Sequence, residues 1–189
     1  MTQTEPTVKI ENVVASATLK QTIDLNAVVK TFASVEYRPE QFPGLVFRLK
    51  KPKTATLIFN SGKMVCTGAK SENQAKKAVH KVVRELKSNG ILITGKVEIK
   101  VQNIVASANL KGKIDLEKSA FTLSRTMYEP EQFPGLIYRM AVPKVVILLF
   151  ASGKLVCTGA KKEGEVYIAV NKLHQNLEDE GLIYYDDEF

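Results

Sequence analysis

The chain contains few of the residues that enzymes use for chemistry. Its 189 residues include no tryptophan, two cysteines and two histidines. The histidines, His80 and His174, are not equivalent positions of the repeat described below. No metal-ligand spacing, phosphate-binding loop or nucleophile motif accompanies them. We therefore expect a protein that is not an enzyme and that holds neither a metal ion nor another cofactor.

The cysteine count and the lack of long apolar runs exclude two further classes. Cys66 and Cys157 lie in apolar segments next to a threonine, and two thiols without an export signal do not make a disulfide framework. We expect both to be buried, reduced thiols. No apolar run approaches the roughly 20 residues that a membrane-spanning helix needs. We expect a soluble, intracellular protein with no membrane partner.

The chain contains instead a long internal repeat with a constant offset of 91 residues. Residues 39–45 return unchanged as 130–136, and the segments 13–17, 61–63 and 65–70 return with one change or none. A period this long that occurs only twice indicates a duplicated half-domain and not a solenoid. Two copies imply a pseudo-twofold molecule, which suits a target that is itself nearly twofold, such as a DNA duplex.

The repeat divides the chain into residues 1–95, with the repeat at about 8–90, and residues 96–189, with the repeat at about 99–180. The link between the copies contains no proline, so we expect both halves to form one sheet. The net charge of +7 favours a polyanionic partner. Residues 1–95 carry 15 Lys and Arg against 7 Asp and Glu, whereas residues 96–189 carry 12 against 13. The first half should therefore meet phosphate more strongly.

The chain ends in an acidic tail that includes Asp186, Asp187 and Glu188. This tail is either solvated or a site for a basic protein.

Both copies predict the same order of elements. In the first copy these are a strand at 9–20, a helix at 24–32, strands at 34–37, 45–49, 53–59 and 63–69, and a longer helix at about 73–88.

The helix ends carry recognisable signals. Asp24 is placed to begin the short helix, with Val29 among the residues on its apolar side. Ser71 and Gln74 fit a capping box for the longer helix, and Gly90 fits its C-terminal stop.

This order predicts an α+β domain in which the helices cover one face of the sheet. Ile58, Met64 and Cys66 share the parity that faces the helices. The opposite parity is apolar as well, although a solvated outer face should be polar. An uncovered apolar face of this size marks a binding surface. That parity carries Ala55, Leu57, Phe59, Val65 and Thr67 in the first copy, and Val146, Leu148, Phe150, Val156 and Thr158 in the second.

Basic and uncharged polar residues accompany this apolar face. The mixture suits a minor groove, where A N3 and T O2 accept hydrogen bonds, sugars supply an apolar wall and phosphates line the rims. The basic residues are Arg48, Lys63, Lys70, Arg139, Lys154 and Lys161. The polar residues are Asn12, Ser16, Thr67, Asn103, Ser107 and Thr158.

Four phenylalanines lie beside tight turns at the rim of the predicted sheet, namely Phe42, Phe59, Phe133 and Phe150. Apolar side chains in such positions wedge between base steps and kink the duplex, and easily deformed steps such as TA are then preferred. Simpler interpretations remain open. The phenylalanines could be core anchors, the threonines and asparagines ordinary strand and turn residues, and the lysines a solvated surface. The apolar face could equally bury against a second subunit or another protein.

Four strings of the second copy resemble signatures of the TATA-box-binding protein family. They are residues 102–105, residues 128–140, the Phe-Ala-Ser-Gly-Lys of residues 150–154 and the Thr-Gly-Ala-Lys of residues 158–161. The resemblance covers about residues 8–180. It implies a pseudo-twofold saddle, with a curved ten-stranded antiparallel sheet, concave on DNA, and helices on the convex face. It also implies a general transcription initiation factor that binds the minor groove of A·T-rich promoter DNA.

The resemblance assigns roles to individual positions. The four phenylalanines are implied as the kinking wedges. Residues implied to contact base edges or the groove floor are Asn12, Asn103, Thr67, Thr158, Val14, Val65, Val105, Val156, Leu57 and Leu148. Residues implied to contact phosphate are Arg48, Lys63, Lys70, Ser61, Arg139, Lys154, Lys161 and Ser152.

The resemblance also implies protein partners. The segment through which the family recruits transcription factor B matches Glu129, Glu131 and Gln132 here. RNA polymerase is implied as a further partner, recruited with that factor. The short N-terminal segment and the acidic end resemble the archaeal form. We accordingly expect a location at the archaeal nucleoid in the cytoplasm, or in the nucleus if the source is eukaryotic. Gln41 stands where many relatives carry a basic residue, and Pro43-Gly44 stand where eukaryotic first copies often carry alanine, which leaves phosphate contact there open.

Overall fold

The computed structural model describes residues 5–186, so Asp187 and Glu188 of the acidic tail lie outside the described residues. The chain forms two compact units. The first unit is Asn12–Gln102, and the second unit combines residues 5–11 with 103–186.

The first unit holds most of β1 (Thr7–Thr18) and the beginning of β5 (Glu98–Asn109). Between them lie α1 (Leu25–Thr31), β2 (Leu45–Lys50), β3 (Lys53–Ile58), β4 (Lys63–Ala69) and α2 (Glu72–Ser88). The second unit holds the rest of β5 and then β6 (Lys113–Ile114), α3 (Leu116–Thr122), β7 (Thr126–Met127), β8 (Leu136–Met140), β9 (Val145–Leu149), β10 (Lys154–Ala160), α4 (Glu163–Asp179) and β11 (Ile183–Tyr184).

The chain passes from one unit to the other within β1, after Glu11, and within β5, after Gln102. Both β1 and β5 are long strands that contribute to each unit. Within the second unit Ser107 Oγ donates to Glu11 Oε1 at 2.7 Å, and within the first unit Gln102 Nε2 donates to Ser16 Oγ at 2.8 Å. The first residues of each copy therefore pack with the other copy.

The α+β class is confirmed, and the order of hydrogen-bonded strands is β2-β3-β4-β1-β5-β10-β9-β8-β7. Residues 5–186 thus contribute nine strands to this sheet, where the sequence predicts ten. The strand expected at 34–37 is reduced to a single antiparallel bridge between Glu36 and Val46, whereas its repeat mates form β7. A small sheet of β6 and β11 was not predicted.

The helix signals are confirmed with two differences. Asp24 caps α1 through bonds from the N–H groups of residues 26 and 27, but Val29 is 41% exposed because it lies one residue past the buried stripe. Ser71 Oγ accepts from Gln74 N as expected. Gln74 Oε1 instead accepts from Lys70 N, so the capping box is only half formed.

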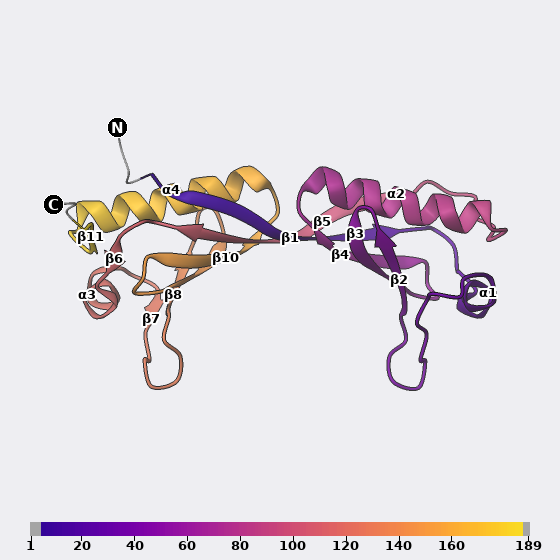
Figure 1. Cartoon of the computed structure of the whole chain (residues 1–189), viewed down its shortest axis with the longest axis horizontal. Coiled ribbons are helices and arrows are strands. Elements are labelled where there is room, and N and C mark those ends of the chain that lie inside the picture. The colour runs from indigo at the N-terminus through magenta and orange to yellow at the C-terminus, as the bar shows by residue number, and fades with distance from the viewer. Residues whose placement is uncertain (1–4, 187–189) are drawn as a thin grey trace. The chain divides into compact units, whose positions relative to one another are not determined.

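In each unit the long helix covers one face of the strands. In the first unit α2 packs on β2, β3 and β4, and in the second unit α4 packs on β10. Ile58, Met64 and Cys66 are fully buried against the helix side, as their parity predicts. The loops that precede β2 and β8 extend on the side away from the helices (Figure 1). The other face of each unit, which we call the open face, carries no helix in the described part of the chain.

None of the helices within residues 5–186 is both long and apolar enough to cross a membrane.

Candidate nucleic-acid interface

The open face of each unit presents a row of apolar side chains across adjacent strands. Strand pairing aligns Ser16 with Val65, Val65 with Leu57, and Leu57 with Val46. In the second unit the aligned row is Ser107, Val156, Leu148 and Ile137. Their burial is intermediate, as is that of Val14 and Val105. Each unit therefore leaves a partly accessible apolar surface.

Asn12 and Thr67 lie together on the open face of the first unit. Asn12 Nδ2 donates to Thr67 Oγ1 at 3.0 Å, and the backbone N–H of Gly68 donates to Asn12 Oδ1 at 2.7 Å. Gly68 has φ +100°, next to a shift of strand register between β1 and β4. The bulge leaves the Gly68 N–H without a strand partner, and the Asn12 amide oxygen takes it.

The second unit reproduces this arrangement. Asn103 Nδ2 donates to Thr158 Oγ1 at 3.1 Å, and Gly159 N donates to Asn103 Oδ1 at 2.7 Å. Gly159 has φ +102°. The sequence predicted these four side chains as a set but not that they bond to each other in pairs.

The backbone N–H fixes the direction of each amide, because an N–H group can only donate to the oxygen end. Each asparagine therefore keeps one free N–H on Nδ2, while the hydroxyl of each threonine donates a longer, 3.4 Å bond to the oxygen of the same amide. Each asparagine thus presents one hydrogen-bond donor to a ligand that contacts the open face.

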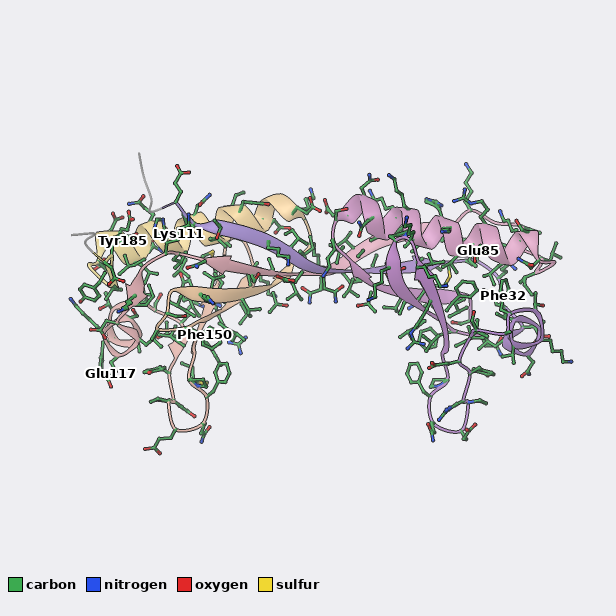
Figure 2. All side chains as sticks on the ribbon, in the orientation of Figure 1. Phe32, Glu85, Lys111, Glu117, Phe150 and Tyr185 are labelled. Carbon is green, nitrogen blue, oxygen red and sulfur yellow. The ribbon has the colours of Figure 1, made fainter. Side chains whose placement is uncertain are left out.

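Two phenylalanine pairs lie at the ends of the strands. The rings of Phe42 and Phe59 are 5.8 Å apart at 70°, and those of Phe133 and Phe150 are 5.9 Å apart at 66°. Phe42 is 43% and Phe133 37% exposed, so these two are not core anchors. Figure 2 shows Phe150 on the side of its unit away from α4.

A glycine makes room for each ring pair. A Cβ at Gly44 would lie 2.6 Å from Cε1 of Phe42 and 3.1 Å from Cε1 of Phe59. At Gly135 the corresponding distances to Phe133 and Phe150 are 2.8 and 3.1 Å. The sequence predicts only a turn at Gly44, although Phe-Pro-Gly is unchanged between the two copies.

The basic side chains expected to meet phosphate, Arg48, Lys63, Lys70, Arg139, Lys154 and Lys161, are all exposed. Ser61 and Ser152 each accept a 3.4 Å bond from the backbone N–H of the lysine two residues later, Lys63 or Lys154. Arg48 is already engaged, because its Nη1 lies 2.9 Å from Glu36 Oε1. This role of Glu36 is not predicted from the sequence.

The loop before β8 carries the residues expected to bind a protein partner. Glu129, Glu131 and Gln132 are exposed and line a shallow hollow of about 380 Å³ with Pro130. The backbone N–H of Gln132 donates to Glu129 O at 3.0 Å, which closes the turn. The equivalent turn in the first unit is closed by a bond from Gln41 N to Arg38 O.

The cysteines and histidines lie elsewhere. Cys66 and Cys157 are free and buried, and burial raises the pKa of the Cys157 thiol to about 11. His174 Nε2 lies 2.7 Å from Tyr185 Oη, which also donates to Glu178. Burial, with Glu178 beside it, raises the pKa of Tyr185. Within residues 5–186, no cluster of three His, Cys, Asp or Glu side chains is placed to hold a metal ion.

Comparison with known proteins shows the family of the chain. The family model described as transcription factor TFIID, or TATA-binding protein, matches residues 7–89 and 98–179. The TATA-box-binding protein of Pyrodictium occultum is 59% identical over 173 residues, which cover 92% of this chain and 87% of that protein. That of Sulfolobus acidocaldarius is 58% identical over 170 residues, which cover 90% of this chain and 86% of that protein.

A solved structure extends the likeness to the fold. The structure of Methanococcus jannaschii TBP superimposes with a TM-score of 0.82 at 49% identity, over 91% of this chain and 98% of that one. Both copies of the repeat, the paired strands of the open faces and the helices behind them are thus those of a known family, and the chain belongs to the TATA-box-binding protein family.

Proposed function

We propose that the two open faces bind the minor groove of an A·T-rich promoter duplex. The observation that supports this proposal is the free Nδ2 N–H of Asn12 and of Asn103, each oriented by a backbone N–H, within an apolar surface. The floor of an A·T minor groove offers only acceptors, whereas a G·C pair adds the guanine amino donor. Donors over an apolar surface match the acceptors of an A·T groove, whereas the guanine amino group of a G·C pair repels them.

The apolar rows would pack on sugars and base edges beside these donors. The rows contain Val65 and Leu57 in the first unit and Val156 and Leu148 in the second, with Val14 and Val105 on the same faces. Arg48, Arg139 and the four exposed lysines, with Ser61 and Ser152, would contact phosphates on the rims. Counterion release then makes the affinity fall with salt.

The phenylalanine pairs would kink the duplex. Each pair has one ring more than a third exposed and a second ring that supports it edge to face. A minor groove about 6 Å wide does not admit a sheet, so binding requires that base steps open. Insertion of the exposed ring costs a few kcal/mol of stacking, offset by contact over the widened groove.

A competition experiment with inosine tests the groove and the sequence choice together. An inosine·cytosine pair lacks the guanine amino group, so its minor groove resembles A·T while its major groove resembles G·C. We expect A·T and I·C duplexes to compete equally for the protein and the G·C duplex to compete weakly. Equal competition by I·C and G·C duplexes would contradict minor-groove reading.

We also propose that the bound protein recruits transcription factor B, and through it RNA polymerase. Two carboxylates, Glu129 and Glu131, lie on the exposed loop before β8, whereas the equivalent loop carries Arg38 and Glu40. Only the loop of the second unit is therefore suited to a basic partner surface.

A second candidate function is self-association through the open faces. The half-buried apolar rows favour it, because no element within residues 5–186 covers them. Sedimentation at several salt concentrations, with and without an A·T-rich duplex, separates the two. A dimer that DNA dissociates is a resting state of a DNA-binding protein, whereas a dimer that never yields to DNA supports the second function.

A further inference from the structure

The two units differ at one position beside an arginine that both copies share. Arg48 and Arg139 are repeat mates, but the mate of Glu36 is Met127. Arg48 Nη1 and Glu36 Oε1 are 2.9 Å apart. Among the ion pairs of residues 5–186, none involves Arg139. The same guanidinium is thus paired in the first unit and unpaired in the second.

Strand pairing puts all four side chains on the open faces. Glu36 pairs with Val46 and Met127 with Ile137, and directly paired residues project on the same face of a sheet. Arg48 and Arg139 follow two residues along the same strands, so they share that face.

Glu36 also lies close to a proposed wedge. It lines a hollow of about 140 Å³ with Arg38, Phe42 and Gly44. A phosphate that reached Arg48 would therefore lie beside a carboxylate. In the second unit it would lie beside the thioether of Met127, which is 54% exposed.

We propose that Glu36 competes with DNA phosphate for Arg48, so that Arg139 is the stronger phosphate contact of the two. This inference rests on the proposed minor-groove function. The Glu36–Arg48 pair is exposed, with 61% and 56% of the two side chains accessible, so it breaks readily but opposes binding. The total charge is more positive in the first half and alone would favour phosphate binding there. At this pair of arginines the ion pair with Glu36 favours the second half instead.

The test is equilibrium binding of the full chain to an A·T-rich duplex across a salt series. E36Q removes the competing charge. We expect about two- to fivefold tighter binding at low salt and a salt slope steeper by up to about one unit, since one more phosphate contact releases counterions. E85Q is the matched control, because it changes the net charge equally on α2, the helix behind the open face (Figure 2). It should leave the slope unchanged.

Reciprocal variants sharpen the test. M127E should weaken binding and flatten the slope, because it recreates the competing pair in the second unit. R139Q should flatten the slope more than R48Q does in the wild-type background. R48Q should become the more costly of the two changes once E36Q is present.

Two outcomes would overturn the inference. If wild type prefers the A·T duplex but E36Q and E85Q behave alike, Glu36 does not control Arg48, and the proposed function stands without this refinement. If wild type shows no preference for the A·T duplex, the proposed function and the inference fail together.

Discussion

The backbone N–H of Gly68 donates a 2.7 Å hydrogen bond to Asn12 Oδ1, and this bond determines which end of the amide faces outward. The Asn12 NH₂ group is left beside Thr67, with one proton engaged and one free. A bulged glycine in the backbone therefore sets the hydrogen-bonding polarity of a side chain on the open face. Gly159 does the same for Asn103.

Replacement of Asn12 by aspartate should abolish this polarity while keeping the fold. A carboxylate still accepts from Gly68 N but has no proton for the acceptors of an A·T groove. A buried acceptor that loses its hydrogen-bond partner costs about 1–3 kcal/mol, so we expect N12D to bind an A·T-rich duplex about tenfold more weakly. Fluorescence anisotropy measures the affinity. N26D, which makes the same change at an exposed position of α1, is the control, and equal binding by both variants would refute the role of Asn12.

Gly44→Ala should disturb the first phenylalanine pair. The added Cβ meets ring atoms at 2.6 and 3.1 Å, so the partly exposed Phe42 must rotate away. We expect a melting temperature within a few degrees of wild type and a smaller bend in bound DNA, measured by energy transfer between the duplex ends. Gly95→Ala is the control, because nothing lies within 4 Å of a Cβ there. An unchanged bend with G44A would show that the glycine does not position the wedge.

The buried thiol of Cys157 predicts a pH dependence of stability. Its pKa is raised by burial from 9.0 to about 11, so the folded state favours the neutral thiol. The resulting stabilisation is complete below pH 9 and is lost as the pH rises toward 11. The difference in unfolding free energy between wild type and C157A should therefore shrink between pH 8 and pH 10.5 in urea titrations. A difference that stays constant would mean that the thiol titrates normally.

The proposed recruitment of transcription factor B, together with the charge difference between the two loops, predicts which loop the factor contacts. Reversal of charge by E131R should abolish the slower-migrating ternary complex in a gel shift and leave binary DNA binding intact. The equivalent substitution E40R in the first unit should have no effect on either complex. Loss of the ternary complex with E40R alone would assign the partner to the other loop.

Most of the fold could be predicted because the same pattern of elements occurs in both copies of the repeat. Successive side chains of a strand point to opposite faces, so the sequence places Ile58 and Met64 in the core and Leu57 and Val65 on the open face. The prediction of a strand at 34–37 was wrong because a short edge segment depends on tertiary pairing, and only the Glu36–Val46 bridge forms. The β6–β11 sheet was missed because two-residue strands leave no period to detect.

The sequence predicts which residues belong to the candidate site, but not the hydrogen bonds and ring contacts between them. Recurrence at an offset of 91 singled out Asn12, Thr67 and the phenylalanines, since each returns in the second copy. The bond from Gly68 and the space beneath the rings at Gly44 depend on backbone geometry that spacing does not encode. Glu36 was not predicted as a site residue because it does not recur: its repeat mate is Met127.

The central claim is that aromatic side chains at the rims of two apolar faces open a duplex from its minor groove. Its most direct test is the end-to-end distance of an A·T-rich duplex, measured by energy transfer, with wild type and with F59A/F150A. F42A/F133A changes the exposed ring of each pair, and F121A, at a 93% exposed position on α3, is the control. We predict a shortened duplex with wild type and F121A, and a straight, at least tenfold more weakly bound duplex with both double variants. Unchanged curvature and affinity in the double variants would contradict the account.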